Sequence, residues 1–118
     1  MSDALRLTDF EEMVLLVVSR LGGDAHGLVI RQALREVAGR AASVGSIYAT
    51  LDRLEAREMV VSRPGAPSAE RGGRAQRYYA IESAGAQALE AAETTRAKLR
   101  TRLRPGWEPA GEIDERSR

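Results

Sequence analysis

The stretch Arg71-Gly72-Gly73-Arg74-Ala75-Gln76-Arg77-Tyr78-Tyr79 joins a basic, glycine-containing turn to a short apolar segment. Residues 77–81 (RYYAI) and the earlier residues 59–63 (MVVSR) have the β-branched and aromatic composition of strands. Two such segments on either side of a glycine-containing turn predict an antiparallel hairpin with arginines at its tip. Arginine is well suited to bind phosphate groups, so the tip indicates contact with a nucleic acid backbone.

Two helices are predicted at the start of the chain. Thr8 and Glu11 have the spacing of a capping box, which predicts a helix over residues 9–21 that is apolar nearly all round and ends at Gly22-Gly23. A helix with this composition is covered on most sides, by its own domain or by another subunit. Apolar residues at helical spacing, opposite charged ones, predict a second helix over residues 26–38; the apolar set is Leu28, Ile30, Ala33, Leu34 and Val37.

A third helix is predicted over residues 44–57, with Ser43 as its N-cap. The link 40–42 before it could pair as a minimal strand. The buried stripe of the helix is predicted to be Val44, Ile47, Leu51 and Leu54, and the opposite face Ser46, Ala49, Thr50 and Arg53. Small side chains and one arginine suit close approach to base edges in the major groove, and we expect Ser46 and Thr50 to contact bases or backbone.

A fourth, long helix is predicted over residues 83–104, capped by Ser83 and stopped by Pro105-Gly106. Its alanines would allow the close approach of a partner helix, so residues 83–104 are expected to be a dimerisation helix after a DNA-binding domain at 1–82. We expect the tail, residues 105–118, to be disordered. The residues expected to mediate dimerisation are Phe10, Val14, Ala88, Ala92, Thr95, Leu99 and Leu103.

The predicted order of elements is that of a mainly α fold with a small β-hairpin, a winged helix-turn-helix with a long C-terminal helix. In this architecture the third helix reads the major groove and the hairpin grips the flanking backbone. The residues expected to bind DNA are Ser43, Ser46, Tyr48, Ala49, Thr50, Arg53, Arg71, Gly72, Gly73, Arg74 and Arg77.

Charge and composition exclude several classes of function. The 118 residues carry a net charge of only +1, but four arginines and one glutamate between Ser62 and Tyr79 give the middle of the chain a local positive charge. There is no cysteine and only one histidine, which argues against a disulfide, a metal site or a cysteine nucleophile. Neither a nucleophile–base pair nor a phosphate-loop motif occurs, so we expect no enzyme activity and no cofactor. No segment resembles a signal peptide or a membrane span, and we expect a cytoplasmic protein.

Several of these residues have plainer interpretations. The three arginines near the turn could belong to a solvated loop with surface ion pairs, for example with Glu70. Tyr48 is expected to pack in the core first and to contact a phosphate second. Arg53 could pair with Glu36 or Asp52 within the domain. His26 is best explained as the residue that starts the second helix, although a pH switch is an alternative.

Three segments together resemble the PadR-like family of bacterial transcriptional regulators: FEEMVLLVVSRLGGDAHGLVIRQAL (10–34), SVGSIYATLDRLEAREMV (43–60) and ERGGRAQRYYAIESAG (70–85), followed by one long helix. The length is similar to the short branch of that family. The resemblance implies a homodimer, a partly palindromic operator and repression. It also implies a possible small-molecule effector at the dimer interface, although Trp107 lies beyond the helix on which some relatives carry a drug-stacking tryptophan.

The sequence therefore predicts a sequence-specific DNA-binding regulator, a homodimeric repressor whose partners are double-stranded DNA and a second copy of itself. A winged-helix module that binds protein is the first alternative, and the basic hairpin argues against it. A small-molecule sensor with secondary DNA binding is the second, and it would need an interfacial cavity lined with aromatic side chains.

Overall fold

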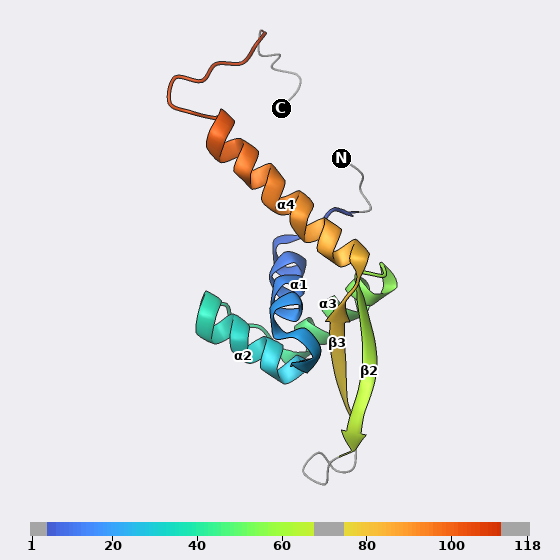
Figure 1. Cartoon of the computed structure of the whole chain (residues 1–118). Coiled ribbons are helices and arrows are strands. Elements are labelled where there is room, and N and C mark those ends of the chain that lie inside the picture. The colour runs from blue at the N-terminus through green and yellow to red at the C-terminus, as the bar shows by residue number, and fades with distance from the viewer. Residues whose placement is uncertain (1–4, 68–74, 112–118) are drawn as a thin grey trace.

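Three helices, a hairpin and one long helix follow one another in the predicted order (Figure 1). The structure is a computed structural model that describes residues 5–67 and 75–111. Its elements are α1 (Asp9–Leu21), the 3₁₀ turn η2 (Gly22–Asp24), β1 (Ala25–His26), α2 (Gly27–Ala38), α3 (Val44–Ala56), β2 (Val60–Pro67), β3 (Ala75–Ile81) and α4 (Ser83–Arg102). The predicted mainly helical winged helix-turn-helix is confirmed.

The ends of the helices follow local chemistry. The Thr8 hydroxyl accepts from the Glu11 amide at 3.1 Å, and the Glu11 carboxylate accepts from the Thr8 amide at 2.8 Å, which is the predicted capping box. Gly22 ends α1 with φ 62° and Gly39 ends α2 with φ 63°, a backbone conformation that glycine adopts without strain. These caps set the lengths of the first two helices.

The small sheet has the order β1-β3-β2 and is antiparallel throughout. The expectation that residues 40–42 form the minimal strand is wrong, because Ala25 and His26 pair with Tyr79 and Tyr78 instead. The link before α3 leaves Gly39 in a left-handed turn, and its Ala42 carbonyl accepts from Arg31 Nε at 2.9 Å, so this backbone is held by a side chain.

The core lies where α1, α2 and α3 meet the sheet. Its fully buried members are Val14, Leu15, Val18, Ala25, Ile30, Leu34, Ile47, Leu51, Leu54, Met59, Val60, Tyr79 and Ala88. Of the two adjacent tyrosines in β3, Tyr79 is the buried one, as period-two alternation allows. The part of α4 up to Arg96 contacts α1, and the end of the helix projects away from the other elements (Figure 1).

The start of α4 differs from the expectation. Ser83 is already inside the helix, and the N-cap is Glu82, whose side chain makes no capping hydrogen bond. The Glu82 amide instead donates to the Met59 carbonyl at 2.9 Å, so the connection before β2 holds the chain where α4 begins. The helix ends at Arg102 because residues just before Pro105 disfavour the helical conformation.

Candidate DNA interface

The N-terminal half of α3 presents small, exposed side chains. The Ser43 hydroxyl accepts from the Ser46 amide at 3.0 Å and donates to the Ser46 hydroxyl at 2.9 Å, so the predicted N-cap is confirmed. Ser43, Ser46 and Ala49 are all exposed. This surface has no bulky side chain that would keep a duplex at a distance.

Thr50 does not lie on that surface. Only 1% of it is exposed, so the expectation that it contacts DNA is wrong. Its hydroxyl donates to the Ser46 carbonyl at 2.8 Å and accepts from Arg53 Nη2 at 3.1 Å. With both hydrogen-bonding roles satisfied locally, a threonine can be buried in a helix flank at little cost.

Arg53 lies farther along α3, with 57% of its side chain exposed. The alternative interpretation, that Arg53 pairs with Glu36 or Asp52, names the wrong carboxylates. Arg53 Nε lies 3.5 Å from Oε2 of Glu11, a residue of α1 whose side chain is buried. A charge pair with a buried carboxylate gives the exposed guanidinium a defined orientation on the helix.

Tyr48 is half-buried and packs against the start of α2. A Cβ atom at Gly27 would lie 2.5 Å from the Tyr48 Cζ and 2.6 Å from its hydroxyl oxygen. Only glycine therefore allows this tyrosine to approach α2 so closely. The packing agrees with the first expectation for Tyr48, and a phosphate contact by its hydroxyl stays a prediction.

The β2–β3 hairpin, here called the wing, carries arginines along its described strands. Arg77 is exposed and its Nη1 donates to the Ser62 hydroxyl at 2.8 Å, which in turn donates to Glu55 at 2.7 Å. Arg63, on β2, lies 5.0 Å over the Tyr78 ring and donates to the Gly23 carbonyl at 3.2 Å. The candidate residues at the tip, Arg71, Gly72, Gly73 and Arg74, lie outside the described residues.

Arg63 was not among the predicted site residues, although it is one of the four arginines in the basic middle of the chain. It is exposed, and it pairs with Tyr78 in the register that places Pro64 opposite Arg77. The two arginines therefore lie on neighbouring strands, one residue apart in register, so their side chains leave opposite faces of the hairpin. Aligning residues 59–63 with residues 77–81 as antiparallel strands would have placed Arg63 beside Tyr78 and Arg77, because cross-strand neighbours follow from the register.

His26 joins the wing to α2. Its Nδ1 accepts from the Val29 amide at 3.3 Å and lies 2.6 Å from Gln76 Nε2 on β3, while its ring meets the edge of Tyr78. The expected role at the start of the helix is confirmed. Among the residues that the structure describes, no group of three His, Cys, Asp or Glu side chains is placed to hold a metal ion.

The residues expected to mediate dimerisation fall into two groups. Val14 and Ala88 are 0% and 1% exposed within a single chain, so the expectation that they face a partner is wrong. Phe10 and Ala92 are half-buried, Thr95 and Leu99 are exposed on the second half of α4, and Leu103 is exposed just after the helix. A second copy could therefore meet the latter set, not the former.

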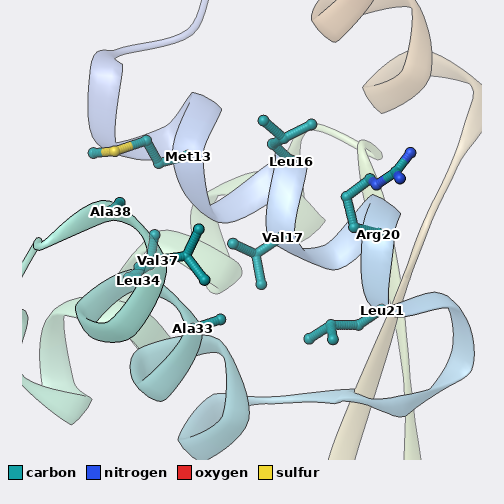
Figure 2. A pocket seen from close by; sticks show the side chains of 9 residues that line it. All are labelled: Met13, Leu16, Val17, Arg20, Leu21, Ala33, Leu34, Val37 and Ala38. Carbon is teal, nitrogen blue, oxygen red and sulfur yellow. The ribbon is translucent and has the colours of Figure 1, made fainter.

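An apolar groove of about 290 Å³ lies between α1 and α2. Figure 2 shows side chains from both helices facing it: Met13, Leu16, Val17, Arg20, Leu21, Ala33, Leu34, Val37 and Ala38. Leu16 is 50% exposed and Val37 is 87% exposed. Val37 thus belongs to the apolar set predicted for α2 but is not buried. Leu28, on the same helix, is also half exposed. Arg20 is the groove's one charged residue.

The helices in residues 5–67 and 75–111 are all too short or too polar to cross a membrane. Comparison with known proteins gives a family. The family described as "Transcriptional regulator PadR-like family" matches residues 14–91. A curated 37.1 kDa protein in transposon TN4556 of Streptomyces fradiae is 32% identical over 99 residues, which cover 84% of this chain and 26% of that protein. The chain thus spans about a quarter of the length of that relative.

Solved structures share the fold. A PadR-like transcription factor from Bacteroides fragilis superposes with a TM-score of 0.69 at 21% identity, covering 80% of this chain and 85% of that one. Bacillus subtilis PadR in complex with operator DNA superposes with a TM-score of 0.64 at 19% identity, covering 93% of this chain and 56% of that one. At these identities the likeness extends to the winged-helix architecture.

Proposed function

The chain belongs to the PadR-like family of transcriptional regulators, and from this premise we propose that it is a homodimeric repressor of a partly palindromic operator. The observation that carries the proposal is the small-residue surface of α3 beside a wing with exposed arginines. In a winged helix-turn-helix these two elements meet one duplex, the helix in the major groove and the wing on the flanking backbone.

The reading surface in this proposal consists of Ser43, Ser46 and Ala49. None has a long side chain, so α3 can enter the groove deeply, and the Ser46 hydroxyl can donate to base edges or phosphates. Arg53 adds an oriented positive charge two turns along the same helix. Arg77 extends the positive surface onto the face of the wing that carries Ser62, and Arg63 adds positive charge on the opposite face. Arg71 and Arg74 would extend the positive surface to the tip.

The projecting half of α4 and the apolar groove support a dimer. Leu99 and Leu103 are 57% and 51% exposed, and the groove exposes Leu16 and Val37 on the same chain. Covering such side chains stabilises by about 25 cal/mol per Å² of apolar surface removed from water. A two-fold axis would present two α3 helices roughly 34–36 Å apart, one turn of the duplex, which is why a palindrome is expected.

Selection of bound sequences from a random duplex pool tests the proposal. A palindromic consensus with half-sites one helical turn apart is the expected result. Enrichment of a single, unrepeated half-site would contradict the dimer. No enrichment at low salt would contradict DNA binding altogether and would favour the protein-binding alternative.

The wing is tested separately by Arg74→Ala, measured by gel shift on the selected operator over a series of salt concentrations. Loss of one phosphate contact per subunit makes the plot of log K against log salt shallower by about 0.9 for each contact. Arg102→Ala removes the same charge from the far end of α4 and serves as the control. Equal slopes for the two variants would contradict the role of the wing.

A further inference from the structure

Glu11 is a buried carboxylate that joins α1 to α3. It is 6% exposed, and three groups surround its oxygens. Oε1 accepts from the Thr8 amide at 2.8 Å and lies 3.5 Å from Arg57 Nη1, while Oε2 lies 3.5 Å from Arg53 Nε. One side chain therefore both caps its own helix and holds two arginines, one in the last turn and one at the C-cap of the helix that we propose to read DNA.

The contacts continue along α3 toward its reading end. Arg53 Nη2 donates to the Thr50 hydroxyl at 3.1 Å, which donates to the Ser46 carbonyl at 2.8 Å. The Ser46 hydroxyl accepts from Ser43, the N-cap, at 2.9 Å. Polar contacts thus run from the first turn of α1 to the Ser46 carbonyl, and the separate Ser43–Ser46 hydroxyl contact lies in the same first turn of α3. The buried hydroxyl of Thr50 links Arg53 to the Ser46 carbonyl.

The residue next to Glu11 holds the long helix. Glu12 Oε1 accepts from Arg96 Nη1 at 2.5 Å, and this contact raises the pKa of Arg96 above its ordinary value. Adjacent carboxylates in the first turn of α1 therefore point to different elements, Glu11 to α3 and Glu12 to α4. The turn lies between the helix that would pair two subunits and the helix that would read the duplex.

We propose that Glu11 is a positioning residue for DNA recognition, which sets the orientation of α3 relative to α1 and α4 through Arg53 and Arg57. The inference depends on the proposed function, since it concerns how the same reading helix is held. In a dimer, a small rotation of α3 about its contact with α1 moves both reading surfaces, so the fit to two half-sites is lost while general attraction to phosphates is kept.

The test is Glu11→Gln, which keeps an oxygen that can accept from the Thr8 amide but removes the charge that the arginines pair with. Affinities for the selected operator and for a scrambled duplex are measured on the full chain. A simple charge effect would tighten binding to both duplexes, because one negative charge fewer repels DNA less. If Glu11 positions α3, the affinity for the operator should instead fall about tenfold, a size typical of residues that share one contact network. The affinity for the scrambled duplex should stay the same or rise.

Two further variants test whether the effect of Glu11→Gln comes from its contacts with the arginines. Glu90→Gln removes an exposed acid on α4 and is the charge-matched control, expected to keep the wild-type ratio of the two affinities. Arg53→Lys retains the positive charge but loses the guanidinium donors that reach Glu11 and Thr50. Arg53→Lys is expected to lower the ratio of operator affinity to scrambled-duplex affinity. In the Arg53→Lys background, Glu11→Gln should lower this ratio by less than half as much as it does in the wild type. Circular dichroism and sedimentation confirm that each variant is folded and has the wild-type oligomeric state.

If Glu11→Gln unfolds at the assay temperature, Arg57→Lys replaces it, because Arg57 contacts Glu11 but lies outside the proposed reading surface. A wild-type ratio for Arg57→Lys would then overturn the proposal. Operator binding by Glu11→Gln that equals or exceeds the wild type would overturn it as well. A wild-type protein that enriches no duplex would instead remove the proposed function itself, so the two failures are distinguishable.

Discussion

Replacing Gly85 by alanine is expected to loosen the junction between the wing and α4. Gly85 is buried in the first turn of α4, and an added Cβ would lie 2.3 Å from the Met59 carbonyl oxygen and 2.9 Å from Ile81 Cγ1. The Met59 carbonyl already accepts from the Glu82 amide at 2.9 Å. The obstructing atom is therefore a backbone atom held by a hydrogen bond, and no side-chain rotation can move it away.

The size of the effect follows from these distances. Ordinary contact of a methyl group begins at about 3.4 Å, so α4 and the segment at Met59 must separate by roughly 1 Å. Overpacking of this kind costs about 3 kcal/mol, at the upper end of the usual range, and the better helix propensity of alanine returns up to about 1 kcal/mol. The net loss of about 2 kcal/mol corresponds to a fall in Tm of roughly 8 °C for a domain of this size.

Gly45→Ala is the matched control, since Gly45 also lies in the first turn of a helix. The nearest atom to its added Cβ is the Ser43 hydroxyl oxygen at 3.9 Å, so only the propensity gain remains and Tm should rise slightly. Thermal unfolding followed by circular dichroism measures both variants. The protein concentration must be equal in all samples, because the Tm of the proposed dimer would depend on it. A Gly85→Ala protein that melts at or above the wild-type temperature would refute the steric reasoning.

Two further outcomes are expected. Burial, and to a smaller extent the nearby Asp52 and Glu55, raises the pKa of Tyr79 above 10.0. The neutral phenol therefore stabilises the fold below about pH 10, and this stability is lost as the pH rises through the raised pKa. Tyr79→Phe should therefore lose less unfolding free energy than the wild type in urea titrations between about pH 9 and pH 12, and equal losses would contradict the burial argument. Ser43→Ala should cost about 1 kcal/mol of unfolding free energy because it removes an N-cap, whereas Ser83→Ala, which removes none, should cost almost nothing in the same assay.

Features that depend on neighbouring residues could be predicted from the sequence. The capping box of Thr8 and Glu11, the cap at Ser43 and the glycine after α2 each involve residues within four positions, and their chemistry is the same in any fold. The two strands of the wing also follow from composition. These local signals were enough to give the order of the helices and the hairpin.

Features that depend on distant residues were predicted less well. Glu11 was assigned its capping role alone, because nothing in its vicinity indicates that Arg53, in another helix, would reach the same carboxylate. Thr50 was placed on the exposed face because it is polar, yet its hydroxyl is satisfied by Ser46 and Arg53 and it can be buried. The pairing of β1 with β3 likewise joins residues about fifty positions apart.

The errors over core and interface have one common cause. Apolar periodicity tells which residues share a face of a helix, but not whether the neighbour that covers the face belongs to the same chain. Val14 was expected at an interface and is in the core, whereas Val37 was expected to be covered and is 87% exposed. Val37 lines the apolar groove, and Leu99 is exposed on a helix half that leaves its own domain. Monomeric proteins rarely leave two such apolar surfaces uncovered. The interface is therefore better sought where the apolar pattern and the exposure disagree than where the pattern is strongest.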